Sequence, residues 1–161
     1  MDARFEDAEE RPLRLHALDA EDLAVVASLV QDAMATGKDL AWMRRKRRFA
    51  LFLNRFRWED AEAARRAGRP YERVRTVLLV DHVTGVRASG LDPADKEQAV
   101  SVLDLAFDAS PDAEDPGGKL RVLLAGDGEI EISVEYLEVR AEDVTRPWLA
   151  PSGKAPSHPG A

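Results

Sequence analysis

Arginine side chains in the middle of this sequence are its strongest candidates for binding chemistry. The stretch 44–57 holds seven basic residues and no acidic one, and Arg73 and Arg75 follow in a stretch rich in valine and leucine. Clustered positive charge attracts carboxylates, phosphates or the acidic surface of a partner. The basic members of the first stretch are Arg44, Arg45, Lys46, Arg47, Arg48, Arg55 and Arg57. Their use in binding depends on how the chain arranges them.

The side-chain pattern predicts that four of these arginines lie on two paired strands. Apolar residues occur on both faces of the stretch 48–57, which is typical of a central strand. If it pairs antiparallel with the next strand so that residue numbers sum to 130, Arg57 faces Arg73 and Arg55 faces Arg75. The same register pairs Leu53 with Val77, Leu51 with Leu79, Phe56 with Val74 and Phe52 with Leu78.

Four like charges across a strand pair destabilise it unless they are neutralised. Two interpretations follow from this predicted arginine ladder. Acidic residues of the same chain neutralise it, with Glu129, Glu131 and Glu135 as the candidates, or an anionic ligand or protein partner does so. The basic run at 44–48 is expected at the tip of a hairpin, where charge also discourages aggregation of strand edges.

Catalytic chemistry has weaker support. The sequence contains no cysteine, which excludes disulfides, thiolate metal sites and cysteine nucleophiles, and no standard phosphate-loop, dinucleotide, zinc or serine-hydrolase motif is present. Asp81 next to His82 could orient a general base, and Asp92 and Asp95, with Asp81, could bind a divalent cation. Turn and helix-cap roles are favoured for these residues. We therefore expect no metal and no cofactor.

Composition is that of a water-soluble protein. The chain has 161 residues, 33% charged residues and a net charge of −7, which argues against general attraction to nucleic acid or anionic lipid. No apolar run approaches the roughly 18–20 residues of a membrane helix, and residues 1–12 do not resemble a signal peptide. We expect a cytoplasmic protein that does not associate with membranes.

One helix is expected at 20–35. Asp19 is a suitable N-cap, acidic residues occupy the first turn, and Gly37 is a suitable end. The apolar stripe Leu23, Val26, Ala27 and Val30 has helical spacing. Such an amphipathic helix needs a sheet on which to pack.

Strands are expected for most of the remainder. Residues 13–17 form a short strand, 40–43 and 48–57 form the hairpin, and a polar segment ending at Gly68 contains a short helix with a Glu62–Arg66 pair. Residues 98–110 fit helix or strand, and alternation favours strand. Asp127–Gly128 predicts a two-residue hairpin turn into a strand whose inner face is Ile130, Ile132, Val134 and Tyr136.

These elements predict an α+β fold. A strand, a loop, a strand, a tight turn and a strand occur at about 48–91 and again at about 99–140. Together with the helix they suggest a largely antiparallel curved sheet or partial barrel, roughly of the pleckstrin type, with one amphipathic helix packed on it. We predict a disordered acidic N-terminus at 1–12, a single domain at 13–149 and a flexible proline-rich tail at 150–161.

Two stretches resemble a known family. "LHALDAEDLAVVASLVQDA" followed by "RRFALFLNRFRWE" is similar to an alphaproteobacterial family of small proteins catalogued as a domain of unknown function. The resemblance covers about residues 13–148. It implies a bacterial cytoplasmic protein and gives no activity, cofactor or catalytic residue. Within these stretches Gln31, Asp32, Asn54 and Arg55 are polar among apolar residues, which suggests a buried polar network or a shared site.

The sequence therefore favours a non-enzymatic protein-binding or regulatory module that binds a protein partner or a second copy of the chain. Nucleic-acid or phosphate binding through the basic hairpin and the arginine ladder is the alternative, and a hydrolase-like enzyme using Asp81, His82 and Asp92 is least favoured. The candidate ligand- or partner-binding residues are Arg48, Asn54, Arg55, Arg57, Arg73 and Arg75.

Overall fold

A computed structural model of the chain describes residues 11–92 and 94–149. The expectations for residues 1–10 and 150–161 therefore lie outside the described residues. The strands are β1 (Arg14–Ala17), β2 (Met34–Thr36), β3 (Leu40–Met43), β4 (Arg48–Phe56), β5 (Glu72–Val80), β6 (Val83–Ser89), β7 (Ala99–Ala109), β8 (Gly118–Leu124), β9 (Glu129–Val134), β10 (Val139–Asp143) and β11 (Trp148–Leu149). The helices are α2 (Ala20–Val30) and α3 (Ala61–Ala67), with 3-10 turns η1 (Gly37–Asp39), η2 (Arg44–Lys46) and η3 (Trp58–Asp60).

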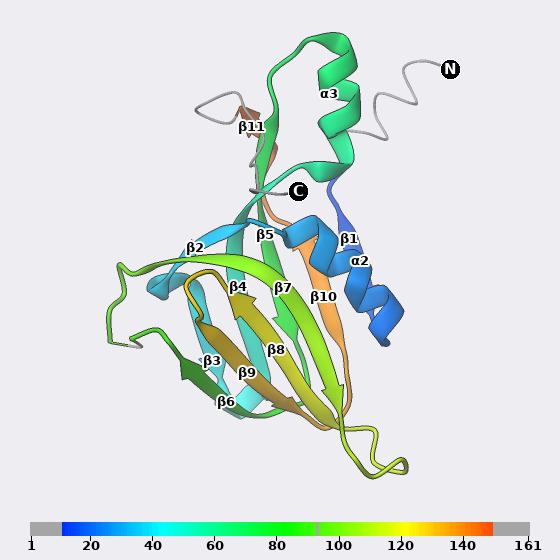
Figure 1. The fold of residues 1–161 in the computed structure, drawn as a ribbon, viewed down its shortest axis with the longest axis vertical. Helices are drawn as coiled ribbons and strands as arrows, with labels where there is room; N and C mark the ends of the chain where they lie inside the picture. Colours follow the sequence, from blue (N-terminus) through cyan, green and yellow to red (C-terminus); the bar gives the residue numbers. More distant parts are fainter. Residues whose placement is uncertain (1–10, 93, 150–161) are drawn as a thin grey trace.

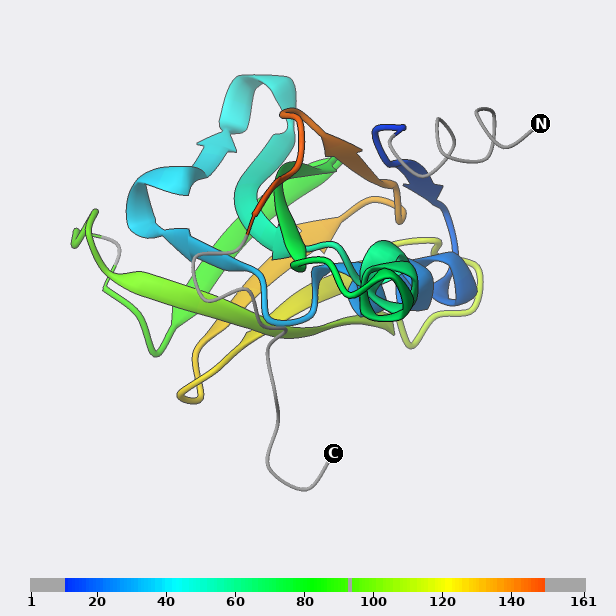
Figure 2. The same cartoon turned by 90° about the horizontal axis from the view of Figure 1, so that it is seen from above.

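The strands form one curved antiparallel sheet. Its order is β1-β10-β5-β4-β2-β7-β8-β9-β6, while β3 pairs with β4 and β11 with β5. Figure 1 and Figure 2 show the sheet bending round, so that β7, β8, β9 and β6 face β3, β4 and β5 across the core. The barrel stays open, because β3 and β6 do not pair. The predicted α+β fold with a curved, largely antiparallel sheet is confirmed.

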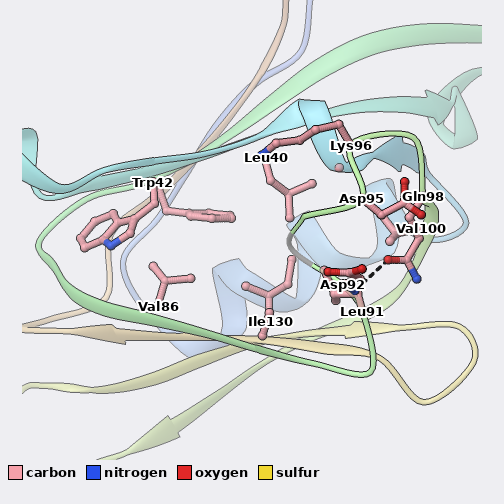
Figure 3. Close-up of a pocket in the computed structure, with 13 residues that line it drawn as sticks. Leu40, Trp42, Val86, Leu91, Asp92, Asp95, Lys96, Gln98, Val100 and Ile130 are labelled. Carbon is pink, nitrogen blue, oxygen red and sulfur yellow. Dashed lines mark hydrogen bonds between the residues drawn. The ribbon is translucent and has the colours of Figure 1, made fainter.

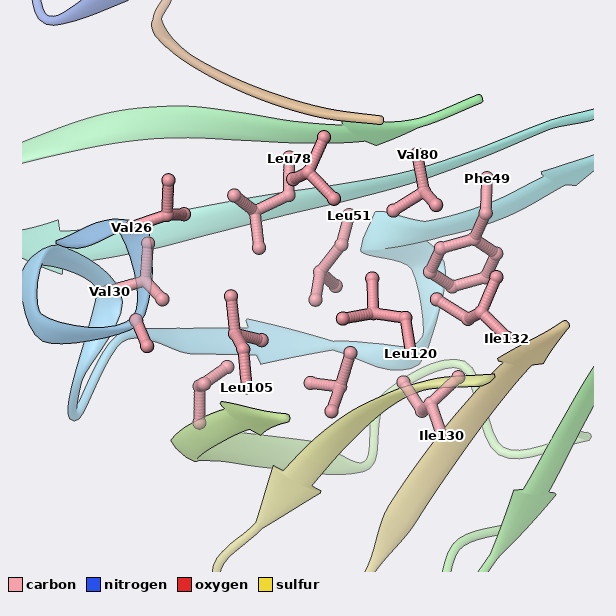
Figure 4. Packing of buried hydrophobic residues seen from close by; sticks show 14 of the residues in the cluster. Val26, Val30, Phe49, Leu51, Leu78, Val80, Leu105, Leu120, Ile130 and Ile132 are labelled. Atoms are coloured by element: carbon pink, nitrogen blue, oxygen red, sulfur yellow. The ribbon is translucent and has the colours of Figure 1, made fainter. Parts of the chain in front are cut away.

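The core lies between the two sides of this sheet. Phe49, Leu51 and Leu78 on one side meet Leu120 and Ile132 on the other (Figure 4), and these side chains are almost completely buried. Helix α2 contributes Val26 and Val30 to the same cluster and packs against β7 and β1 (Figure 4). The apolar stripe of α2 therefore packs on the sheet between these two strands, as predicted.

Helix α2 is shorter than predicted. Its N-cap is Asp19, which accepts a hydrogen bond of 2.8 Å from the amide of Asp22, as expected. The helix ends at Val30 rather than near residue 35, because Asp32 adopts a left-handed conformation with φ of 65° and its amide bonds to the carbonyl of Val102. Residues 34–36 then pair with β4 and β7 as β2. Pairing with the sheet outweighs helix propensity here.

Several local predictions are confirmed. Residues 40–43 and 48–56 form a hairpin whose tip is η2. Helix α3 ends at Gly68 in a left-handed conformation and carries the Glu62–Arg66 ion pair at 3.3 Å. Residues 99–109 form strand β7. The predicted two-residue turn at Asp127–Gly128 is wrong in length: the turn before β9 is longer, since Leu124 bonds across it to Gly128, with Gly126 and Asp127 both left-handed.

The predicted position of Tyr136 is wrong. Strand β9 ends at Val134, and Tyr136 lies beyond it, 42% exposed. Its ring stacks on the imidazole of His82 with centroids 3.9 Å apart. The side chains of Ile130, Ile132 and Val134 are buried in the core, as predicted.

The predicted register of β4 with β5 is also wrong, by one residue. Asn54 lies opposite Arg75, Arg55 opposite Val74 and Phe56 opposite Arg73, so paired residue numbers sum to 129. Because a shift of one residue moves a side chain to the other face, Arg55 is on the inner face and Arg73 and Arg75 are on the outer face. The arginine ladder does not form.

Candidate functional site

Arg55 is the centre of a buried ion network. Its side chain is 0% exposed and donates two hydrogen bonds of 2.8 Å to the carboxylate of Glu59. It also donates to both oxygens of Asp143, at 3.0 and 3.1 Å, and to the hydroxyl of Thr76 at 2.8 Å. Asp143 accepts further bonds from Thr76 and from the amide of Leu13. The guanidinium therefore joins β4, η3, β5 and β10 and fixes the start of β1.

Arg57 belongs to a second internal network, which holds the segment between β4 and β5 that includes α3. Its guanidinium lies 3.2 Å from Glu72 and 3.7 Å from Asp60. Asp60, itself buried, receives two bonds of 2.7 Å from Arg69. Acids of the chain thus neutralise both inner arginines. They are not the predicted Glu129, Glu131 and Glu135, which pair with Arg121, Lys119 and Arg47.

The outer face holds the other candidates in separate contacts. Arg75 donates to Asp39 at 2.7 Å and to the side-chain oxygen of Asn54 at 3.1 Å, and its guanidinium lies over the ring of Phe52. Arg48 donates to Asp81 at 2.7 Å. The six candidate residues therefore do not form one surface. Binding of a partner by Arg48, Asn54, Arg73 and Arg75 stays a prediction.

These contacts change the acidity of the carboxylates. Burial raises the pKa of Glu59, but the hydrogen bonds and charge of Arg55 outweigh it, so that the pKa lies below its ordinary value. The pKa of Asp81 is lowered in the same way, by Arg48 and Arg140 against the effect of burial. Hydrogen bonds from Arg69 are the main reason that the pKa of Asp60 is lowered. These acids stay ionised at neutral pH and serve as structural counter-ions.

The proposed hydrolase residues are not assembled. Both imidazoles bond to one carboxylate: the Nε2 of His82 lies 2.7 Å from Glu138 and that of His16 lies 2.6 Å from its other oxygen. Asp81 instead binds Arg48 and Arg140, and no hydrogen bond joins it to His82 in the described part of the chain. Within residues 11–92 and 94–149 no cluster of three or more acidic or histidine side chains could hold a metal ion.

A groove between α2 and β7 has the form of a recognition site. It has a volume of about 460 Å³. Its helix wall consists mainly of small residues at helical spacing, Ala20, Leu23, Ala24, Ala27, Ser28 and Gln31, and its strand wall is the continuous run 103–107. Successive residues of a strand point to opposite faces, so five in a row line one groove only if the edge of the strand is open.

Hydrogen bonding confirms that this edge is open. β2 pairs with β7 at residues 99–101, and the last bonds on that side join Val102 to Asp32 and Ala33. Beyond them no strand of the described segments pairs with this edge. The amide of Ser110 bonds to Gly117, towards β8, and alternation then directs the peptide groups of 105, 107 and 109 away from β8.

The bend at Leu103 separates the paired and open parts of the edge. The register with β8 shifts between Val102 and Asp104, which is the signature of a β-bulge, and Leu103 is 41% exposed. The amide of Leu105, which points away from β8, donates a hydrogen bond of 2.8 Å to the side chain of Asp104. The edge is therefore partly protected in the free protein.

Sequence reasoning missed this groove. Its signals were the length of β7, eleven residues against three in β2, and the small residues at i, i+4 and i+7 of the helix. Neither signal identifies a groove until the sheet order places α2 beside β7.

Comparison with known proteins gives a family. The model of the family described as protein of unknown function (DUF2948) matches residues 13–158. The chain belongs to this family. No curated protein matches it, and no solved structure does. The resemblance noted in the sequence is thus confirmed at the level of the DUF2948 family, which assigns no activity.

The polar residues of the DUF2948 signature stretches have different roles. Arg55 forms the buried network, while Asn54 contacts Arg75 on the opposite face. Gln31 accepts a bond from the indole of Trp58 through its backbone carbonyl, and Asp32 makes the left-handed turn after α2. They set the path of the chain around β4 rather than forming one common site.

Proposed function

We propose that this DUF2948 protein is a non-enzymatic binding module of the bacterial cytoplasm that holds an extended segment of a protein partner along the open edge of β7. The single observation that supports the proposal is the continuous run 103–107 in the wall of the groove. A strand edge with free peptide groups is a template for a further strand. No helix of the described segments is long and apolar enough to cross a membrane.

Binding would extend the sheet by one strand. The peptide groups of Phe107 and Ala109 would pair with the incoming backbone, which supplies affinity without reading sequence. Specificity would come from its side chains, which alternate between the two faces. The exposed Ala24 and Ser28 leave room for those that point to the helix.

Charge favours a basic partner over a second copy of the chain. The open part of β7 carries Asp104 and Asp108 and no basic residue. Two copies of this edge paired antiparallel about Ala106 would place Asp104 opposite Asp108, and like charges in that position destabilise a strand pair. We therefore propose a segment in which apolar residues alternate with lysine or arginine.

The test uses two substitutions on neighbouring residues of α2. Peptides enriched from a displayed library of random twelve-residue sequences would be synthesised, and their affinity measured by fluorescence anisotropy. Ala24→Arg fills the groove and adds a positive charge, so affinity should fall at least about tenfold, equivalent to 1.4 kcal/mol. Val25→Arg, which lies outside the groove on the exposed face, should leave affinity unchanged.

Hydrogen exchange gives the second measurement. A bound peptide should slow exchange of the amides of Phe107 and Ala109. Equal affinity of the two variants for the peptides would contradict the proposal. Enrichment of peptides that lack basic residues would contradict it as well. A change in sedimentation mass without peptide would indicate self-association instead.

Nucleic-acid binding is the alternative function. The exposed basic side chains of η2 still support it, but the arginine ladder that it also required does not form. Affinity for RNA or DNA that falls steeply with salt would support it. The net charge of −7 and the internal neutralisation of Arg55 and Arg57 favour the protein partner.

A further inference from the structure

A second cavity lies where the barrel fails to close. It has a volume of about 300 Å³ and lies between β3 and β6. Figure 3 shows Trp42 and Val86 at one end, Leu40 and Ile130 in the middle, and Asp92, Asp95 and Gln98 at the other end, while the side chain of Lys96 extends towards Leu40. Phe49, Leu91 and Val100 complete the apolar lining. This volume and this lining are those of a pocket for a small ligand.

Backbone contacts close both ends of the gap between the strands. At one end the amide of Val83 bonds to the carbonyl of Arg47 at 2.9 Å. At the other, Gly37 and Lys38 bond to Gln98 and Lys96, each at 3.1 Å. Gly37 is needed for this approach, because a Cβ there would lie 2.5 Å from the carbonyl oxygen of Asp95. A polypeptide running along the gap would meet these closures, whereas a small molecule entering from the side would not.

The polar end has spare donors and acceptors of both charges. One oxygen each of Asp92 and Asp95 accepts an amide of its own loop, from Ala94 at 2.9 Å and from Glu97 at 3.0 Å. Within the described residues, no hydrogen bond reaches the other oxygen of either carboxylate. The side-chain oxygen of Gln98 accepts from the amide of Asp92 at 2.8 Å, so its NH₂ group points elsewhere. Lys96 lines the pocket, and its ammonium has no ion pair among the described residues.

We propose that this pocket binds a free α-amino acid with a large apolar side chain. The two carboxylates match an ammonium group, and the Lys96 ammonium matches a carboxylate. The apolar side chain of the ligand fills the space between Trp42, Val86 and Ile130, where burial of apolar surface provides most of the affinity. A purely apolar ligand would leave the polar end unpaired, and an ion of one sign would use only half of it.

Five small molecules test the proposal by isothermal titration calorimetry. L-Phenylalanine should bind with a saturable heat. Phenethylamine lacks the carboxylate, 3-phenylpropionate lacks the ammonium and glycine lacks the side chain, so each should bind at least about tenfold more weakly. Equal binding of phenethylamine or 3-phenylpropionate would overturn the zwitterion assignment. Equal binding of N-acetyl-L-phenylalanine amide would show that the pocket takes a residue of a polypeptide, and would also overturn it.

Two matched pairs of variants place the binding in this pocket. Lys96→Gln should weaken the affinity for L-phenylalanine at least about tenfold without changing the affinity for phenethylamine. Glu97→Gln, in the same loop but outside the pocket lining, should change neither affinity. Ala88→Trp fills the cavity from β6 and should abolish binding, whereas Ala24→Arg in the α2–β7 groove should not affect it. Binding that survives Ala88→Trp, in a protein whose circular dichroism is unchanged, would overturn the proposal.

Discussion

Arg55→Met is expected to lower the free energy of unfolding by about 3–5 kcal/mol, the range found when one partner of a buried ion pair is removed. Methionine fills much of the space of the arginine stem, so loss of packing contributes little. The cost arises because Asp143, 4% exposed, keeps its bonds from Thr76 and Leu13 but loses the guanidinium. Urea titration followed by circular dichroism measures the change.

An exposed arginine provides the control for this substitution. Arg65→Met in α3 removes a guanidinium that pairs with Glu62 on the surface, where ion pairs contribute little. Unfolding free energies of the two variants that differ by less than 1 kcal/mol would show that the network does not stabilise the fold. The variant Arg55→Met with Asp143→Leu should recover part of the loss, since the unpaired carboxylate is then removed as well.

The position of Arg55 shows where sequence reasoning reached its limit. Its strand, the hairpin before it and the apolar positions on both faces followed from alternation. The register with β5 did not, because the residues between the strands, which include η3 and α3, leave the pairing unfixed. Two registers one residue apart both match apolar residues across the strands. Burial of Arg55 in the observed register is matched by Glu59, four residues along the chain, and by Asp143, which lies close to Arg55 only in the folded chain.

Elements set by short-range chemistry were the easier ones. The N-cap at Asp19, the apolar stripe of α2 and the end of α3 at Gly68 were each predicted from a few neighbouring residues. The end of α2 was not, since β2 leaves helical spacing to pair with β4 and β7. Both proposed binding sites depend on such long-range placement. The groove needs α2 beside an unpaired part of β7, and the pocket needs β3 opposite β6.

Acid is expected to destabilise the fold steeply below about pH 5. Six carboxylates engaged in ion pairs or turns have pKa values lowered by folding: Asp39, Glu59, Asp60, Glu62, Asp81 and Glu138. A group whose pKa is lower in the folded state stabilises the fold above its unfolded pKa, near 4, and this contribution is lost as the pH falls through the folded pKa. Each additional proton bound on unfolding lowers stability by about 1.4 kcal/mol per pH unit.

One group acts in the opposite direction. Burial, together with the charge of Asp60, raises the pKa of Glu72, so its protonation favours the folded state as the pH falls and offsets part of the loss. With six lowered carboxylates against one raised, the unfolding free energy should still decrease from pH 5 to pH 3, more steeply than the about 1.4 kcal/mol per pH unit that one proton causes. Urea titrations at half-unit pH intervals measure it.

A pair of carboxylate variants separates the networks from general acid effects. Asp81→Asn removes a carboxylate whose pKa is lowered by Arg48 and Arg140. The variant should therefore be less stable at pH 7, and its unfolding free energy should fall less steeply in acid. Glu114→Gln, in the exposed loop between β7 and β8, should leave stability at pH 7 unchanged. A slope in acid that is the same for Asp81→Asn and the natural chain would mean that charge repulsion over the whole molecule, rather than the paired carboxylates, causes the acid response. In that case these networks would fix the register of the strands without contributing to the pH dependence of stability.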